Sequence, residues 1–170
     1  MIYAVQNSIL EEFQKHRMAT DSGGFIIAER LPYLALSGGV VLADRLTKLL
    51  IEQRLSLGES RTLIAGFFEL SYVRNTGAAF GLFASADSPY RFVVLSGLAI
   101  VAAVVVIIYS LRSPIEQRLL QGGLALILGG ALGNLYDRLI YRYVVDFLEF
   151  HLGTYYWPTF NLADTAISVG

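Results

Sequence analysis

The feature that most constrains this chain is Phe92–Leu111, a stretch of twenty residues without a charge. Valine, isoleucine, leucine and alanine dominate it, and an α-helix of about this length crosses the ~30 Å hydrocarbon core of a bilayer. Arg112 and Pro114 follow it directly and mark its end. The stretch therefore predicts a membrane-spanning helix.

The composition of the whole chain agrees with a membrane protein. Of its 170 residues 55% are hydrophobic and 16% are charged, whereas a soluble domain usually has about 25% charged residues. The net charge of −1 gives no reason to expect a nucleic-acid partner. The chain has no cysteine, and His16 and His151 lie far apart, so we expect no disulfide, no metal site and no other cofactor.

Three further segments are expected to lie in the membrane. Leu31–Ile51 is a candidate first span, with Pro32 in its first turn, where a missing N–H is tolerated. A glycine-rich span over residues 119–137 allows close packing of helices. A fourth span begins near residue 160, but about ten residues are half of what a crossing requires, so we expect it to be incomplete. The predicted fold class is an all-α membrane protein, a four-helix transmembrane bundle whose fourth helix is truncated.

Two other segments are expected outside the bilayer. Residues 1–30 are mixed and charged, and we interpret them as an N-terminal extension, broken by a loop at Thr20–Gly24 and with Met18 as an alternative start. Residues 61–83 contain the alternating stretch Phe68–Tyr72, which has the period of a strand, and then a turn at Asn75–Gly77. They predict a small β-element.

The short basic loop 112–118 indicates the orientation. Short loops with positive charges stay in the cytoplasm, so the β-element and the segment Tyr143–Trp157 should lie on the extracytoplasmic side. The six aromatic residues of that segment are typical of side chains at the level of the lipid headgroups. Arg138 and Arg142 lie on the same side against this rule, so Arg138 in particular needs a special role.

The unusual polar residues of the apolar segments all fall on the extracytoplasmic side. They are Asp44, Lys48, Asn75, Asn134, Asp137, Arg138, Asp146, Asn161 and Asp164. Asp146 and Asp164 stand in apolar runs, where the charged form of a carboxylate is poorly solvated. Two such carboxylates held together share a proton, which suits them to proton transfer.

The other polar residues each have two interpretations. Asp44 and Lys48 are four residues apart on one helix face, and they form either a neutralising ion pair or a support for the site. Asn75 either stabilises its turn or binds a substrate backbone. Asp137 is a rival carboxylate, but the neighbouring Arg138 favours an ion pair there. The guanidinium of Arg138 suits a carbonyl- or phosphate-binding role, because it makes bidentate contacts.

Five short motifs, taken together, resemble the lipoprotein signal peptidases, also called signal peptidase II. The motifs are Asp44-Arg45-Leu46-Thr47-Lys48, Asn75-Thr76-Gly77-Ala78-Ala79-Phe80, Gly130-Ala131-Leu132-Gly133-Asn134-Leu135-Tyr136-Asp137-Arg138, Val145-Asp146-Phe147 and Phe160-Asn161-Leu162-Ala163-Asp164. The resemblance covers about residues 31–170 and implies a membrane-embedded peptidase domain there. Each motif alone is weak, whereas the five in this order are specific.

The resemblance implies an intramembrane aspartyl endopeptidase. Such an enzyme removes signal peptides from diacylglyceryl-modified bacterial prolipoproteins, cutting before the lipid-modified cysteine. Asp146 and Asp164 would be the catalytic pair. The residues that would bind substrate or support the pair are Asn75, Asn134, Arg138, Asn161, Asp44, Lys48 and Asp137.

The resemblance also implies the surroundings of the protein. We expect a multi-pass protein of the bacterial cytoplasmic (inner) membrane with its active site on the extracytoplasmic side. Its partners would be the prolipoprotein substrate and membrane lipids, with no nucleic acid, and it would act as a monomer.

The alternative is a small proton-coupled membrane transporter or channel subunit. It would distribute polar residues through the depth of the membrane and often repeat one half of the chain in the other. The sequence shows neither property.

Overall fold

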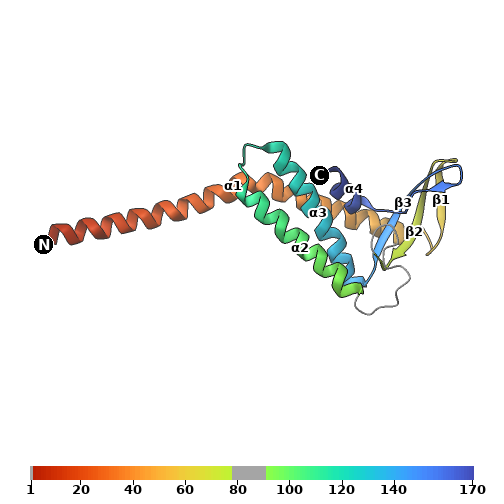
Figure 1. Ribbon diagram of the computed structural model, residues 1–170, viewed down its shortest axis with the longest axis horizontal. Coiled ribbons are helices and arrows are strands. Elements are labelled where there is room, and N and C mark those ends of the chain that lie inside the picture. Colours follow the sequence, from red (N-terminus) through yellow and green to blue (C-terminus); the bar gives the residue numbers. More distant parts are fainter. Residues whose placement is uncertain (1, 78–90) are drawn as a thin grey trace.

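The computed structural model describes residues 2–77 and 91–170, with the side chains of residues 28–77 and 91–170. Its elements in chain order are α1 (Ile2–Arg54), β1 (Ser60–Ile64), β2 (Phe68–Asn75), α2 (Arg91–Arg112), α3 (Arg118–Tyr141), β3 (Val144–Leu152), β4 (Tyr155–Tyr156) and α4 (Leu162–Val169). Figure 1 shows α1, α2 and α3 packed together, the short α4 beside α3, and the strands gathered at one end of these helices. We call this end the sheet end, and the opposite end, where residues 113–117 join α2 to α3, the loop end.

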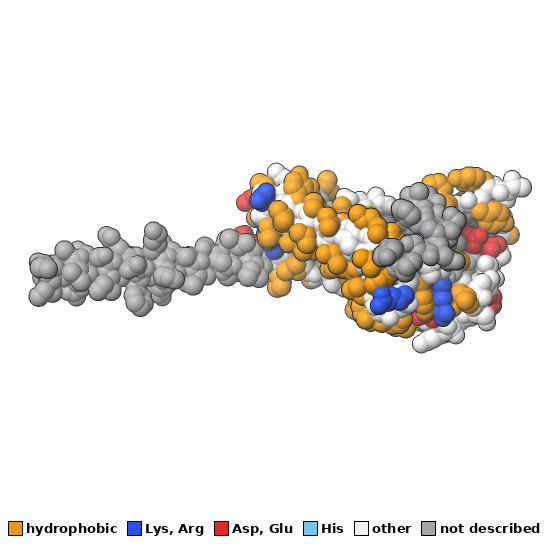
Figure 2. Space-filling model, turned by 60° about the horizontal axis from the view of Figure 1, so that its bottom comes forward, with side chains coloured by type: hydrophobic (Ala, Val, Ile, Leu, Met, Phe, Trp, Pro, Cys, Tyr) orange, Lys and Arg blue, Asp and Glu red, His pale blue; other side chains and the backbone are white. Residues whose placement is uncertain are grey.

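Among the described residues, α2 and α3 are the helices long and apolar enough to cross a membrane. Most apolar side chains of α2 point outward, and Figure 2 shows hydrophobic side chains spread over the helical body. The exposed ones include Val93, Val94, Leu98, Val101, Val104, Val105 and Ile108. An apolar surface of this extent is unfavourable in water and favourable in lipid. The two helices occur where the sequence predicts its second and third spans.

Helix α1 differs from the prediction, because it continues without a break from Ile2 to Arg54. The loop expected at Thr20–Gly24 does not form, and Pro32 lies inside the helix rather than in its first turn. A glycine costs a helix interior only about 1 kcal/mol and a proline removes one backbone hydrogen bond, so helix-forming neighbours can offset both. The predicted first span, Leu31–Ile51, is the part of α1 that approaches the sheet.

The strands form one antiparallel arrangement in the order β1-β2-β3-β4. The predicted β-element at 61–83 corresponds to β1 and β2, while its residues 78–83 lie outside the described residues. The sequence predicted no secondary structure for Tyr143–Trp157. In the structure most of this segment forms β3 and β4. Valine and the aromatic residues of β3 fit a pleated, partly buried surface, which favours a strand.

A small apolar core holds the sheet against the end of α1. Ile51 and Leu55 of α1 pack against Tyr72 of β2 and against Val145 and Phe147 of β3, and all five are buried. Asp146 lies between the last two of these residues. The core therefore fixes the position of its backbone relative to α1.

Glycines allow α3 to approach its neighbours closely. A Cβ atom on Gly130 would collide with the carbonyl oxygen of Ala163 in α4, and one on Gly133 would lie 2.9 Å from Asp44 Oδ2 in α1. A larger residue at position 130 would push α4 away, and one at position 133 would displace the carboxylate of Asp44. These two glycines thus bring α1, α3 and α4 together where the polar residues lie.

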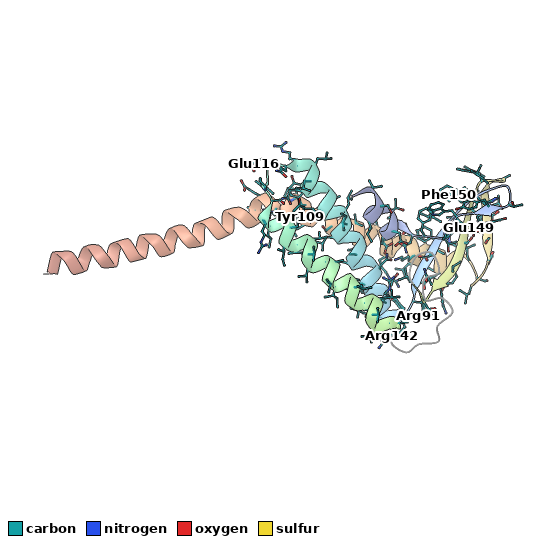
Figure 3. The ribbon with its side chains drawn as sticks, viewed as in Figure 1. Arg91, Tyr109, Glu116, Arg142, Glu149 and Phe150 are labelled. Carbon is teal, nitrogen blue, oxygen red and sulfur yellow. The ribbon has the colours of Figure 1, made fainter. Side chains whose placement is uncertain are left out.

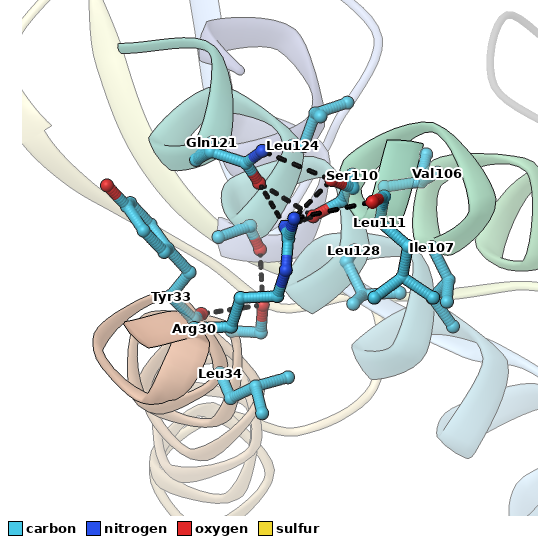
Figure 4. Close-up of a pocket in the computed structure, with 12 residues that line it drawn as sticks. Arg30, Tyr33, Leu34, Val106, Ile107, Ser110, Leu111, Gln121, Leu124 and Leu128 are labelled. Carbon is cyan, nitrogen blue, oxygen red and sulfur yellow. Dashed lines mark hydrogen bonds between the residues drawn. The ribbon is translucent and has the colours of Figure 1, made fainter. Parts of the chain in front are cut away.

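A second polar network lies at the loop end. Arg30 Nη1 donates to the carbonyl oxygen of Ser110 at 2.7 Å, and Ser110 Oγ donates to Gln121 Oε1 at 2.7 Å (Figure 4). An apolar pocket beside it is lined by side chains such as Leu34 and Leu128. Figure 3 shows that the two ends lie well apart. Tyr109 and Glu116 are at the loop end, and Arg91 and Arg142 are at the other end of α2 and α3.

Candidate active site

Asp146 is held on β3 by two side-chain amides. Its Oδ2 accepts a hydrogen bond from Asn75 Nδ2 at 2.8 Å, and its Oδ1 accepts one from Asn161 Nδ2 at 2.7 Å. Only 2% of the residue is exposed. Burial raises the pKa of Asp146 to about 6; the charge of Asp164 adds to the rise, and the two amide hydrogen bonds oppose it.

Asp164 is positioned by the start of α4. Asn161 caps this helix and accepts the Asp164 N–H at 2.9 Å, while Asp164 Oδ2 accepts the Asn161 N–H at 3.2 Å. This reciprocal pair is a capping box, which satisfies two N–H groups that a helix start leaves without partners. The same bonds that begin the helix therefore aim its carboxylate.

Two asparagines connect the carboxylates. Asn134 Nδ2 donates to Asp164 Oδ1 at 2.7 Å, and its Oδ1 accepts from Asn161 Nδ2 at 3.2 Å. Asn161 in turn donates to Asp146, so the chain of contacts runs from one acid to the other through Asn161 and Asn134. Such a pair of carboxylates, one of them with a raised pKa, can take a proton from water and return it to another group.

Lys48 lies buried beside these residues, and two acids share its charge. Its Nζ is 2.6 Å from Asp44 Oδ2 and 2.8 Å from Asp137 Oδ2, and it donates to Asn134 Oδ1 at 3.2 Å. Asp44 Oδ1 also accepts the backbone N–H of Ala163, in α4, at 3.0 Å. Asp44 and Lys48 thus form a buried ion pair that also contacts the site, and Asp137 belongs to the same ion cluster.

The other predicted residues border the pair. Asn75 both closes its turn, by accepting the Gly77 N–H at 2.8 Å, and donates to Asp146. Arg138 is half-buried on α3, one turn after Asn134, and its charge interacts with the carboxylates of Asp164 and Asp146. The structure therefore brings together all nine residues that the sequence predicts for the site.

Two contributors were not predicted. Arg45 Nη1 is 3.7 Å from Asp137 Oδ1, and its Nη2 donates to the hydroxyl of Tyr141 at 2.7 Å. Helical spacing could have indicated it, because residues 45 and 48 are neighbours on one helix face. The backbone N–H of Ala163 carries no side-chain pattern at all, so its bond to Asp44 was not predictable.

Among the described side chains, no group of three His, Asp, Glu or Cys residues could hold a metal ion. His151 lies on β3, where its Nε2 is 3.6 Å from Glu69 Oε1 and its ring stacks on Tyr156 with centroids 4.8 Å apart. It belongs to the sheet rather than to the carboxylate pair.

Known proteins resemble this chain over most of its length. The family model described as signal peptidase (SPase) II matches residues 36–170. The lipoprotein signal peptidase of Francisella tularensis subsp. novicida (strain U112) is 40% identical over 145 residues, which cover 85% of this chain and 89% of the relative. That of Burkholderia mallei (strain SAVP1) is 46% identical over 153 residues, covering 90% and 88%.

Solved structures agree on the fold. One, described as a bacterial membrane enzyme, superposes with a TM-score of 0.71 and 26% identity over 81% of each chain. Another with the same description gives a TM-score of 0.73 and 24% identity, over 81% of this chain and 86% of the other. The matched region contains the carboxylate pair, the two connecting asparagines and the buried lysine. The chain belongs to the signal peptidase II family.

Proposed function

We propose that this chain is an intramembrane aspartyl endopeptidase that removes signal peptides from diacylglyceryl-modified bacterial prolipoproteins. It cuts before the lipid-modified cysteine, and Asp146 and Asp164 activate the attacking water. Family membership supports the peptidase activity and the class of substrate. The geometry of the two acids supports the chemistry.

The observation that carries this chemistry is the connection of buried Asp146 and half-buried Asp164 through Asn161. Its side chain donates to Asp146 and its backbone N–H donates to Asp164. Carboxylates that share a hydrogen-bond partner in this way can hold one proton between them, because two neighbouring negative charges are unfavourable.

The reaction uses the two members in different roles. The ionised carboxylate takes a proton from a water molecule, and the oxygen of that water attacks the scissile carbonyl carbon. The protonated carboxyl donates a hydrogen bond to the carbonyl oxygen, and a proton passes to the leaving amine when the C–N bond breaks. The raised pKa of Asp146 brings its protonated form closer to neutral pH than that of an ordinary aspartate.

The surrounding residues hold the pair and meet the substrate. Asn75, Asn134 and Asn161 orient the carboxylates by donating to them. Arg138, whose fork of N–H groups fits carbonyl or phosphate oxygens, positions the lipid-modified substrate. Lys48 supports the pair through Asn134.

The membrane arrangement that we propose is the one predicted from the sequence. Residues 31–51 of α1, then α2 and α3, cross the inner membrane, and α4 begins the fourth span. The basic loop 112–118 stays in the cytoplasm and the sheet end faces outward. Residues 1–30 form an extension to the peptidase domain at 31–170, and the enzyme acts as a monomer on membrane-bound precursors.

Single substitutions of the two acids test the chemistry. Asp146→Asn and Asp164→Asn each remove the charge and keep one accepting oxygen, while the new NH2 group loses one of the two hydrogen bonds that the carboxylate accepts. The unfolding temperature of each variant is therefore measured together with its activity. We expect either variant to lose cleavage of a lipid-modified precursor peptide by at least ~10³-fold, because each acid has its own role in proton transfer. Glu116→Gln, at the exposed loop end, is the matched control and should cleave like the parent. Near-parental cleavage by either Asn variant, with an unchanged unfolding temperature, would overturn the assignment.

A further inference from the structure

Arg142 joins α3 to β3 in a backbone conformation that side chains rarely adopt. Its φ of 67° lies in the left-handed region, and the other described residues with positive φ are glycines. A Cβ atom is unfavourable in this conformation, whereas glycine takes it without strain. Backbone strain of this kind is concentrated at functional sites. The strain at Arg142 therefore points to a use for its side chain.

The guanidinium of Arg142 lies on an aromatic ring rather than on an acid. Its Cζ is 3.8 Å from the centre of the Phe92 ring, in the first turn of α2, and Figure 3 shows Arg142 at this end of the helix. The face of the ring attracts the cation but leaves the N–H groups at its edge unbonded. Among the described residues, these N–H groups have no hydrogen-bond acceptor. They can therefore bind an anion.

A second arginine approaches the same junction from β2. Arg74 Cζ is 4.6 Å from the centre of the ring of Tyr143, the residue after Arg142. Its Nε donates to the hydroxyl of Tyr72 at 2.9 Å, while the contacts of its two terminal nitrogens within the described residues are with aromatic rings. Both arginines are exposed. The junction of α3 and β3 thus lies between two guanidinium groups that keep free N–H donors.

The described acids do not neutralise these two arginines. In the ion pairs of the described residues, the cation is Arg45, Lys48 or His151. Glu52, whose charge acts on Arg74, has its Oε2 3.8 Å from Arg45 Nη2 and is shared with that residue. The junction therefore presents positive charge to its surroundings.

The junction lies where the apolar surface of the helices ends. Arg142 directly follows α3, and its ring partner Phe92 is the second residue of α2, so both belong to the ends of the two helices that are apolar enough to cross a membrane. Val93 and Val94, next in α2, are exposed apolar side chains. Figure 2 shows basic side chains directly beside the hydrophobic surface of the helical body, toward the sheet end. The ends of spanning helices lie at the level of the lipid headgroups, where phosphate groups are the anions at hand.

We propose that Arg142 and Arg74 form a binding site for the headgroup phosphate of an anionic phospholipid in the outer leaflet. A guanidinium fits phosphate oxygens because it presents paired N–H donors in one plane. This inference rests on the membrane-spanning arrangement of the proposed function and does not depend on its chemistry. Because Arg142 precedes Asp146 by four residues, the bound lipid steadies the start of the strand that carries this acid.

Mass spectrometry of the intact full chain in detergent, with one lipid added at a time, measures the affinity of each protein for single lipids. We expect the parent to bind the first phosphatidylglycerol at least ~5-fold more tightly than the first phosphatidylcholine, the factor expected for one arginine at an anionic surface. Arg142→Gly and Arg142→Asn both tolerate the left-handed conformation, so they should fold and lose most of this preference. A parent without the preference, or a preference that either variant retains in full, would overturn the proposal.

Two further substitutions sharpen this result. Arg74→Gln removes the second arginine and should lower the preference for phosphatidylglycerol at least ~2-fold. Arg61→Gln removes the same charge from an exposed position on β1 and is the matched control, which should behave like the parent. An equal loss in Arg61→Gln and Arg142→Gly would show attraction to the charge of the whole sheet end and would contradict a site. An unchanged preference in Arg74→Gln would contradict a site made by two arginines.

A soluble competitor identifies the lipid as the source of the phosphate. Glycerol 3-phosphate at the concentration of the lipid should leave the binding of phosphatidylglycerol unchanged, because it lacks the acyl chains that hold a headgroup against the apolar surface of α2. Full displacement of the lipid by glycerol 3-phosphate would show a site for free phosphate esters and overturn the proposal.

The same measurement on Asp146→Asn separates this inference from the proposed function. That variant should lose cleavage yet keep the parental preference for phosphatidylglycerol, because both arginines are unchanged. A failed lipid site would show in the lipid affinities alone, and a failed mechanism would show only in the cleavage.

Discussion

The sheet end and the loop end of the helices each hold a cation of α1 against polar groups of α3. At the sheet end Lys48 contacts Asp44, Asp137 and Asn134. At the loop end Arg30 contacts Gln121 and the carbonyl oxygens of Ser110 and Ser113. Both networks are at least partly buried, so burial of polar groups alone does not distinguish a reactive site.

The difference lies in what each cation meets. Arg30 binds mainly backbone carbonyls at the carboxyl end of α2, where a helix leaves such oxygens without partners and its dipole favours a positive charge. Those oxygens do not titrate. Lys48 meets carboxylates and an amide that leads to two further carboxylates. One network can therefore move protons, whereas the other can only fasten helices together.

The largest expected effect is on stability at the sheet end. Lys48→Met removes the cation shared by Asp44 and Asp137, which leaves buried Asp44 without a cation and Asp137 with only Arg45 at 3.7 Å. This should cost about 3–5 kcal/mol of unfolding free energy. Denaturation in detergent, followed by circular dichroism, measures this loss. A cost below ~1 kcal/mol would mean that water reaches the cluster and that the two ends do not differ as described.

The pH dependence of the unfolding free energy should also distinguish the sheet end from the loop end. The pKa of Asp146 is about 6 in the folded chain and 3.8 is its ordinary value, so the folded state binds the proton more tightly. Stability from this group is therefore full below pH ~4 and falls by about 3 kcal/mol as the pH rises through ~6. Comparing unfolding free energies of the parent and Asp146→Asn from pH 4 to 7.5 isolates it, since the variant lacks this slope. Arg30→Met should retain the slope, and its loss there would contradict the assignment to Asp146.

Two glycines of α3 offer a matched pair of substitutions. A Cβ on Gly130 would strike Ala163 of α4, whereas one on Gly122 would meet nothing within 4 Å. Gly130→Ala should cost about 1–3 kcal/mol through overpacking and lower kcat by displacing Asp164. Gly122→Ala should instead gain up to about 1 kcal/mol from helix propensity. Equal behaviour of the two variants would show that α4 adjusts freely to α3.

The smallest effect is expected at the loop end. Arg30→Met removes hydrogen bonds to helix-terminal carbonyls and should cost about 1–2 kcal/mol. Its kcat for the precursor peptide should stay within about twofold of the parent, because no titrating group of the pair is touched. A kcat as low as that of Lys48→Met would show that the two networks are coupled through α1.

The sequence was most informative where a local pattern decides the structure. The uncharged run of α2 is long enough to be recognised without a partner. Asn161 and Asp164, three residues apart before an apolar run, match the pattern of a capping box, which acts within four residues. The order of the spans predicts that the nine polar residues share one end of the helices, and they lie together at the sheet end; the side of the membrane that this end faces stays a prediction.

The sequence failed where distant contacts decide the structure. Strand β3 is buried on both faces from Val144 to Phe147, so it lacks the alternation that reveals a half-exposed strand. Its aromatic residues suggested an interface, yet Phe147 belongs to the core and Phe150 stacks on Phe68 and Phe160. The continuity of α1 through its glycines and proline is likewise set by the whole helix rather than by these residues.

Because the capping box contains the last site residue of the chain, the site is completed late in synthesis. Asp164 follows every other site residue in the chain, and the bonds that begin α4 also aim its carboxylate. A nascent chain that stalls before this residue can insert its earlier helices, but it holds only one of the two acids. Under the proposed mechanism, interrupted translation products should remain inert toward the precursors beside them, and proteolysis can begin only once α4 has started to form.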